Sequence, residues 1–262
     1  MTNADSSGNN FLTDLSTSTE QIYERRERVF LILAAVFICS MTLLNIMGIT
    51  KFIQLGPLAL AVGVLPYPLT FLCTDLICEL YGKKRANFLV TLGLGLNFFI
   101  LGVIYLASYI PSVAPEAMPP WQQIQLAAPV GLPTGETVAG TVELFDFTFH
   151  LTTGAVFASM LAYLAAQYCD VQLFHFWKKL TQGKHLWLRN NFSTLVSQGV
   201  DSFVVITVTF GAAYLAGSMS TAQMLTLMGS NYLFKMCSAL IDTGPFYYLT
   251  FKLKKYLQLE DK

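Results

Sequence analysis

Charged residues are scarce in this sequence. They form 12% of its 262 residues, about half of the roughly 25% that is usual in soluble domains. Apolar residues form 54% of the chain. This shortage of charge excludes an ordinary soluble domain and predicts a polytopic membrane protein.

The sequence also lacks the motifs of several enzyme classes. It contains no G-x-S-x-G, no H-E-x-x-H, no Walker A motif and no G-x-G-D motif. Five cysteines fall in or at the ends of apolar segments: Cys39, Cys73, Cys78, Cys169 and Cys237. Their spacing fits neither a metal site nor a disulfide framework. We therefore expect neither an enzyme nor a metal or other cofactor.

Long apolar runs fill most of the chain. Windows of about 20 apolar residues, enough to cross a bilayer, lie near 29–50, 56–81, 87–110, 142–168, 192–217 and 225–251. They predict an all-α membrane protein with six transmembrane helices in one domain, residues 25–255. The polar residues 1–24 predict a disordered cytoplasmic tail, and residues 256–262 predict a second, short one.

The basic residues are distributed unevenly. Of the 16 lysines and arginines, 14 lie on alternate connections, within residues 25–28, 83–85, 178–189 and 252–262. Because basic residues concentrate on the cytoplasmic side, this pattern places both termini in the cytoplasm. The two exceptions are Lys51, in the first external loop, and Lys235, inside the sixth span.

The second span combines prolines with acidic residues. Pro66 and Pro68 forbid a regular helix before residue 70, and broken helices in membranes usually line cavities. Phe71, Asp75 and Glu79 then recur every four residues, so they share one helix face. This face could stack on a flat ligand and accept hydrogen bonds from it. The structural alternative is a simple kink, with Glu79 reaching the surface beside Lys83 and its neighbours.

Further polar residues lie at membrane depth. Asp201 is about 18 Å beyond Arg189 along a helix, and Asp242 is about 15 Å from Lys252. Asn97 and Gln198 add amides, although Asn97 could equally serve helix packing. Gly244 and Pro245 predict a second broken helix after Asp242.

Charge balance in the spans limits their chemistry. Asp75, Asp201 and Asp242 have only Lys235 to balance them among residues at this depth. Pairing of Lys235 with Asp242 alone would leave two carboxylates unexplained. The remaining options are protonated carboxylates or a ligand that is cationic or rich in hydrogen-bond donors. Glu79 and Lys235 are therefore candidates for ion pairing or proton coupling.

Specific motifs resemble a known family. They are Pro68-x-Thr70-Phe71-x-x-Thr74-Asp75-x-x-x-Glu79-x-Tyr81-Gly82, AYLAAQYCD, LRNNFSTLVSQGVDS, and Lys235 followed by Ile241-Asp242-Thr243. Over residues 29–255 the chain resembles the queuosine precursor transporters, a family also described as vitamin-uptake-like.

The resemblance implies a six-span protein of the bacterial inner membrane. It would import 7-cyano- or 7-aminomethyl-7-deazaguanine, precursors of a modified tRNA base, without contacting nucleic acid itself. The N1–H and 2-amino donors of a deazaguanine suit a carboxylate, and its flat face suits an aromatic ring. We therefore expect these substrate-binding residues: Phe71, Asp75, Asn97, Gln198, Asp201 and Asp242.

A second class of protein fits the same composition. A substrate-capture subunit would need a separate ATP-driven complex, and such subunits usually dock through an Ala-x-x-x-Ala ridge on the first helix. Here Ala34 and Ala35 are followed by Ile38 and Cys39 at that spacing. The sequence leaves open the preferred precursor, the coupling ion, homo-oligomer formation and whether the external loop 111–140 is a lid.

Overall fold

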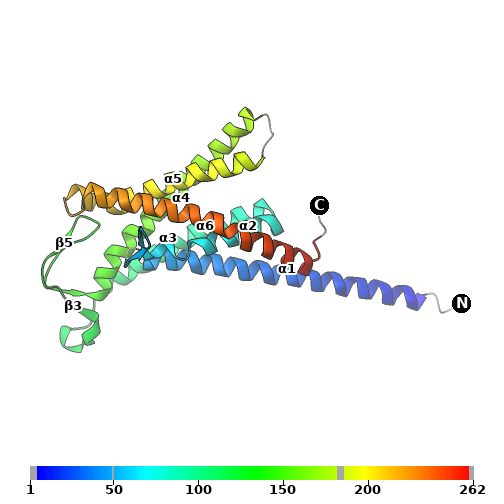
Figure 1. Cartoon of the computed structure of the whole chain (residues 1–262). Coiled ribbons are helices and arrows are strands. Elements are labelled where there is room, and N and C mark those ends of the chain that lie inside the picture. The colour runs from blue at the N-terminus through cyan, green and yellow to red at the C-terminus, as the bar shows by residue number, and fades with distance from the viewer. Residues whose placement is uncertain (1–4, 49, 182–185, 260–262) are drawn as a thin grey trace.

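The computed structural model describes residues 5–48, 50–181 and 186–259, which form a bundle of long helices (Figure 1). The helices are α1 (Asp5–Met47), α2 (Tyr67–Tyr81), α3 (Lys83–Tyr109), α4 (Leu144–Leu180), α5 (Leu186–Leu215) and α6 (Thr221–Tyr256). The first and last few residues of the two predicted tails, 1–4 and 260–262, lie outside the described residues.

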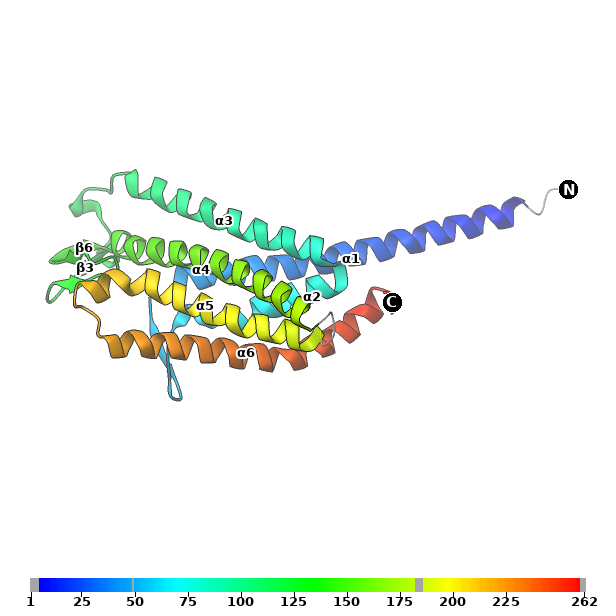
Figure 2. The ribbon, with the colours of Figure 1, turned by 90° about the horizontal axis from the view of Figure 1, so that it is seen from above.

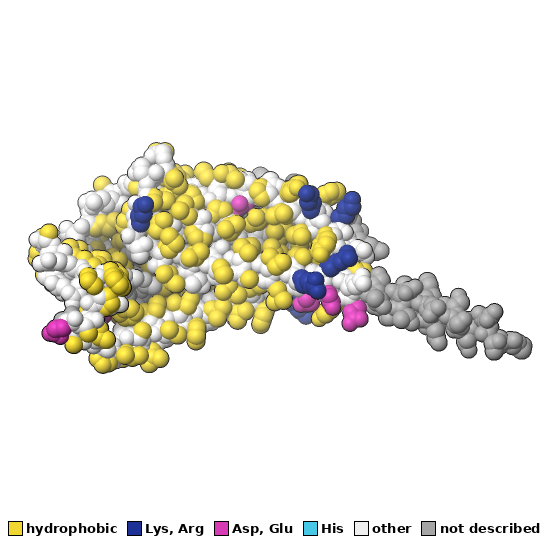
Figure 3. Space-filling model, turned by 90° about the horizontal axis from the view of Figure 1, so that it is seen from below, with side chains coloured by type: hydrophobic (Ala, Val, Ile, Leu, Met, Phe, Trp, Pro, Cys, Tyr) yellow, Lys and Arg dark blue, Asp and Glu magenta, His cyan; other side chains and the backbone are white. Residues whose placement is uncertain are grey.

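The two ends of the bundle differ in character. Both chain termini lie at one end, and the strands β3–β6 of the α3–α4 connection lie at the other (Figure 2). Most basic side chains visible in Figure 3 gather at the end with the termini. We call that end, which carries Arg26, Arg85 and Lys254, the basic end, and the opposite one the hairpin end.

The flank between these ends is largely apolar (Figure 3). Large apolar side chains are exposed along it, among them Leu31, Phe98, Phe99, Leu106 and Leu240. Exposed apolar surface on this scale is costly in water and is typical of side chains that face lipid. The exposed belt therefore marks the membrane-facing part of the bundle.

Within the part of the chain that the structure describes, five segments are long and apolar enough to cross a membrane by length and composition. They are Glu20–Met47, Val62–Tyr81, Lys84–Tyr109, Leu144–Ala166 and Leu195–Leu215. Helix α6 has 36 residues and exceeds the required length, but it is not among these five. The structure thus confirms a helical polytopic membrane protein.

The second predicted span is not one helix. Strands β1 (Phe52–Leu55) and β2 (Leu58–Ala61) form an antiparallel hairpin, and a 3-10 turn (Val62–Val64) leads into α2. Gly56, with a φ of +57°, forms the turn of the hairpin. Proline accounts for the late start of α2, because Pro66 precedes the first helical residue and Pro68 occupies the first turn. The predicted break near Pro66 and Pro68 is present, but a hairpin replaces the expected helix before it.

Strand β2 packs across α6, where the Ala59 N–H donates to Ser230 Oγ at 3.2 Å. In Figure 2 the β1–β2 hairpin crosses α6 at a steep angle to the helices. Two shorter hairpins pair β3 (Gln123–Gln125) with β6 (Thr141–Glu143) and β4 (Val130–Gly131) with β5 (Thr137–Val138). All three hairpins lie in connections between helices.

Two other sequence predictions were wrong. Helix α6 continues through Pro245 instead of breaking at Gly244 and Pro245. A proline removes only one helical N–H, and the other hydrogen bonds of the helix keep it continuous. At the other end of the chain, residues 5–24 extend α1 instead of forming a disordered tail. This segment contains no proline, and an existing helix can grow outward at little cost once it is nucleated.

Candidate functional site

A cavity of about 620 Å3, open space at its mouth included, lies inside the bundle. Its lining comes from α1, the β2–α2 connection, α2, α4, α5 and α6. The polar residues that reach it include Asn45, Tyr67, Asp201, Asn231 and Lys235.

An ion pair forms the most polar part of this cavity. The Lys235 ammonium contacts Asp201 Oδ2, and the two residues are only 2% and 6% exposed. The Tyr67 hydroxyl donates to the same carboxylate oxygen at 3.4 Å. Lys235 Nζ also lies 4.3 Å from the centre of the Tyr67 ring, so the cation rests on an aromatic face. We call Tyr67, Asp201 and Lys235 the charged triad.

The proline break places Tyr67 in this triad. Because Pro66 and Pro68 start α2 at Tyr67, the helix begins within the bundle and points its first turn toward α5 and α6. The 3-10 turn before α2 (Val62–Val64) lies so close to the end of α1 that position 63 requires glycine. A Cβ on Gly63 would lie 2.7 Å from the Leu44 carbonyl oxygen and 2.9 Å from the Gly48 Cα. Any larger residue there would push the connection away from α1.

Apolar side chains complete the walls. Val205, Ile206 and Phe210 line the cavity from α5, and Ala155 lines it from α4. Ile206 and Phe210 are buried and pack with Leu227 of α6, so this packing holds the apolar wall in place. Apolar walls around a few fixed polar groups are typical of sites for flat organic ligands.

The charged triad presents a hydrogen-bond donor beside an acceptor at buried positions. The Lys235 ammonium donates, and the Asp201 carboxylate accepts, at adjacent positions. A buried ion pair contributes little net stability, because the desolvation of both charges offsets their attraction. Its presence in a cavity therefore calls for a functional explanation.

The structure brings some predicted residues together and leaves others apart. Asp201 and Lys235 line the cavity. Gln198 lies one turn from Asp201 toward the basic end of α5, half-buried and outside the cavity lining. Asn97 accepts a hydrogen bond from Asn45 Nδ2 at 2.9 Å, so it supports a cavity residue from α3.

The predicted face of α2 does not line this cavity. The Phe71 ring packs edge-on against Tyr67, with 4.8 Å between ring centres. The Asp75 side chain is exposed, and Asp242 of α6 lies near enough to act on its charge. Glu79 pairs with Lys254 of α6 at 2.7 Å, near the basic end. Asp75 and Asp242 therefore form a separate acidic level, about 12 and 10 Å along their helices from Tyr67 and Lys235.

Sequence reasoning missed Tyr67, Asn45 and Asn231 as members of the site. Tyr67 carried a usable signal, because a tyrosine between two prolines must sit at the start of the broken helix. Asn231 lies one turn before Lys235 on α6, and both are buried. Asn45 lies on α1, and only the tertiary fold brings that helix to the same cavity as α5 and α6.

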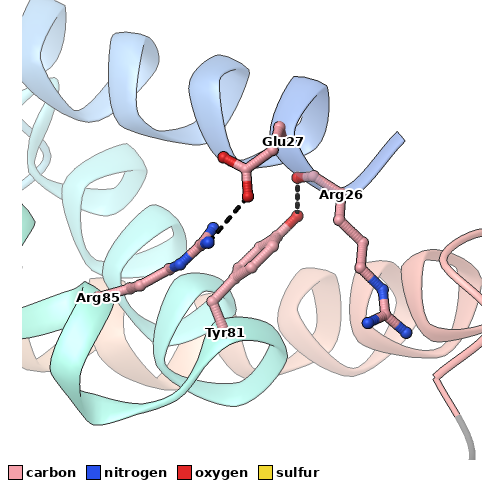
Figure 4. Close-up of polar contacts among 4 residues, drawn as sticks. All are labelled: Arg26, Glu27, Tyr81 and Arg85. Carbon is pink, nitrogen blue, oxygen red and sulfur yellow. Dashed lines mark hydrogen bonds and ion pairs between the residues drawn. The ribbon is translucent and has the colours of Figure 1, made fainter. Parts of the chain in front are cut away.

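Polar contacts tie the helices together at the basic end (Figure 4). The Tyr81 hydroxyl donates to the Arg26 carbonyl at 2.8 Å, and Arg85 pairs with Glu27 at 2.8 Å. These contacts link α2 and α3 to α1, while the Glu79–Lys254 pair links α2 to α6. The Arg85 guanidinium also lies 5.0 Å from the Phe30 ring centre. We call the Glu27–Arg85 and Glu79–Lys254 pairs and the Tyr81–Arg26 bond the end latch.

The fold defines a polytopic membrane protein with a partly polar cavity inside its helical bundle. The model of a family described as "Putative vitamin uptake transporter" matches residues 61–250, so the chain belongs to that family. The chain is also 28% identical over 210 residues to a "Probable queuosine precursor transporter" of Bacillus subtilis (strain 168). This similarity covers 78% of the chain and 77% of the relative. No solved structure gives a significant match.

These matches confirm the family resemblance found in the sequence. The family and the relative are both transporters. The chain is therefore a multi-pass membrane transporter and not an enzyme, as its lack of catalytic motifs predicted.

Proposed function

We propose that this chain imports queuosine precursors, the 7-deazaguanines, across the bacterial inner membrane, and that the charged triad binds them. The named function of the Bacillus subtilis relative supports the substrate class. The chemistry of the cavity supports it independently, because the pairing edge of a deazaguanine carries an acceptor, O6, beside two donors, N1–H and the 2-amino group.

The donor and acceptor order of the Lys235–Asp201 pair carries this proposal. Lys235 can donate to O6 while the Asp201 carboxylate accepts from N1–H and the 2-amino group. Tyr67 already donates to Asp201 and keeps the carboxylate in place. The apolar wall of Ile206 and Phe210 offers contact area for the flat face of the base. A ligand of this kind would meet both charges at once.

Six spans with both termini in the cytoplasm complete the proposed topology, with α6 as the sixth. The two termini lie at the same end of the bundle (Figure 2), as an even number of crossings requires. The basic end is then cytoplasmic and the hairpin end external.

After Lys262 we therefore expect a reporter that works in the cytoplasm, a fluorescent protein, to be active, and a reporter that works outside it, a phosphatase, to be inactive. Near Pro120, in the connection at the hairpin end, we expect the reverse. Paired fusions to a phosphatase and a fluorescent protein measure this directly. A cytoplasmic reporter near Pro120 would exclude the six-span topology.

The access of the cavity follows from this orientation. The residues of α5 and α6 that line it run from Asp201 and Lys235 toward the hairpin end. At the basic end the end latch ties α1, α2, α3 and α6 together. The conformation described here would then receive substrate from outside, and release into the cytoplasm requires the end latch to open.

The acidic level provides acceptors on the proposed release path. Gln198 Oε1 and Asp242 Oδ2 are buried oxygens with no hydrogen-bond partner among the described residues. Asp75 faces the same level from α2. We assign these three residues to transient contacts with the substrate or with a proton, below the charged triad.

Substitution of Arg85 by Gln is expected to loosen the basic end. A cysteine at position 198, in a chain otherwise without cysteine, should then react about two- to fivefold faster with a membrane-impermeant thiol reagent on the cytoplasmic side. The factor follows from the roughly 1 kcal/mol that a part-exposed ion pair contributes.

Arg28 offers a matched control for this experiment. It pairs with Glu24 at 3.1 Å within α1 and so joins no two helices. Arg28→Gln should leave the labelling rate unchanged. Equal rates for Arg28→Gln and Arg85→Gln would show that the end latch does not close the path.

Uptake by vesicles that contain only this chain tests the proposed function. We expect saturable uptake of labelled 7-cyano-7-deazaguanine that excess guanine-like ligand reduces. Binding without uptake, with uptake restored by an added ATP-driven complex, would identify a substrate-capture subunit. If the vesicles show no binding and no uptake, that result contradicts the proposal.

A further inference from the structure

The cavity contains one positive and one negative side chain. Among the described residues that line it, Asp201 and Lys235 are the only acidic or basic side chains. The other polar lining residues are neutral: Asn45, Tyr67, Ser159, Thr209 and Asn231. A bound ligand without charge leaves this balance intact, whereas a cationic ligand adds a buried charge that no lining residue offsets.

The position of Lys235 makes this balance relevant to one part of the ligand. In a deazaguanine, O6 and the 7-substituent project from the same side of the fused rings, a few ångströms apart. If Lys235 donates to O6, the 7-substituent lies beside the same ammonium. The proposed binding mode thus turns Lys235 toward the group in which the two precursors differ.

The two 7-substituents respond to an ammonium in opposite ways. A nitrile is neutral, and its nitrogen accepts hydrogen bonds, so it can share the Lys235 donors with O6. A primary aminomethyl group is protonated at neutral pH, as a lysine side chain is. It offers only donors, and its positive charge repels the Lys235 ammonium, an effect that the low dielectric of a buried site strengthens.

Lys235 is also unable to move away easily. It is 2% exposed, it contacts Asp201, and it lies on the Tyr67 ring. A lysine that swung aside would leave the Asp201 carboxylate and its own ammonium without their buried partners. The cation is therefore a fixed feature of the site.

On the basis of the proposed function, we infer that Lys235 determines specificity and makes the site select 7-deazaguanines with a neutral, acceptor-type 7-substituent over those with a cationic one. The cyano precursor is then the preferred substrate. The acidic level of Asp75 and Asp242 does not alter this order, because it lies outside the cavity lining.

Equilibrium binding of both precursors to the purified full chain tests this inference. The wild type should bind 7-cyano-7-deazaguanine at least about tenfold more tightly than the aminomethyl compound. Lys235→Gln keeps a donor for O6 but removes the charge, so this ratio should fall by about tenfold or more. If Lys235 had a purely structural role, Lys235→Gln would weaken the binding of both precursors alike and leave the ratio of their affinities unchanged.

Asn231→Asp provides a second variant that keeps Lys235. Asn231 is buried one turn from Lys235 and lines the cavity, and aspartate has nearly the same shape. The added carboxylate should favour the aminomethyl compound and lower the ratio, whether or not Lys235→Gln folds. A wild-type ratio within about threefold, or a ratio that neither variant changes, would overturn the inference while the proposed function stands. If neither precursor binds to the wild type, the result instead counts against the proposed function.

Discussion

Asp201→Asn is expected to weaken binding of 7-cyano-7-deazaguanine by about ten- to a hundredfold. The carboxylate accepts charge-assisted hydrogen bonds from the donor edge of the base, and each such bond is worth about 1.5 to 3 kcal/mol. Asparagine has the same shape but replaces one acceptor with a donor, which faces a donor of the ligand. Titration calorimetry on purified protein measures the change.

Asp75→Asn is the matched comparison for this result, because Asp75 is proposed to contact the substrate only on the release path and does not line the binding cavity. It makes the same chemical change on α2, at an exposed side chain outside the cavity lining. We expect its effect on affinity to stay within about threefold. A larger loss for Asp75→Asn than for Asp201→Asn would move the binding site to the acidic level.

Lys235→Met is expected to destabilise the protein by about 3 to 5 kcal/mol, because it leaves the buried Asp201 carboxylate without its cation. Lys51 provides the comparison, since it is exposed in the connection after α1. Lys51→Met should cost at most about 1 kcal/mol. The melting temperature in detergent and the amount of protein in the membrane both report the difference.

The double variant Asp201→Asn, Lys235→Met separates the charge effect from the loss of packing. Removal of both charges abolishes the cost of an unpaired one, so stability should recover most of what Lys235→Met loses. If the double variant is as unstable as the single one, the ion pair is not the cause of the loss.

Much of the architecture could be predicted from the sequence, because the bilayer constrains it strongly. Long apolar runs locate the helices, and the two prolines locate the break before α2. The same reasoning failed at the start of the second predicted span, where apolar side chains favour a transmembrane helix but the local backbone favours a turn. Leu58–Ala61 is apolar and lies within that predicted span, yet Gly56 and Pro57 before it favour a hairpin turn.

The site was harder to predict than the fold. Depth arguments found Asp201 and Lys235, because charges at that depth need partners inside the bundle. The same arguments favoured Asp75, whose side chain is exposed on the bundle instead. Depth along a helix does not fix the direction in which a side chain points, and only packing of α2 against α1, α3 and α6 determines it. Tyr67 was missed because its role depends on two residues more than 130 positions away.

A structure of the protein with bound 7-cyano-7-deazaguanine tests the central claim most directly. We expect the base inside the cavity, with N1–H and the 2-amino group about 3 Å from the Asp201 carboxylate and O6 at a similar distance from Lys235 Nζ. The 7-cyano group should lie on the Lys235 side. Ligand density between Asp75 and Asp242, with the charged triad intact and unoccupied, would contradict the claim.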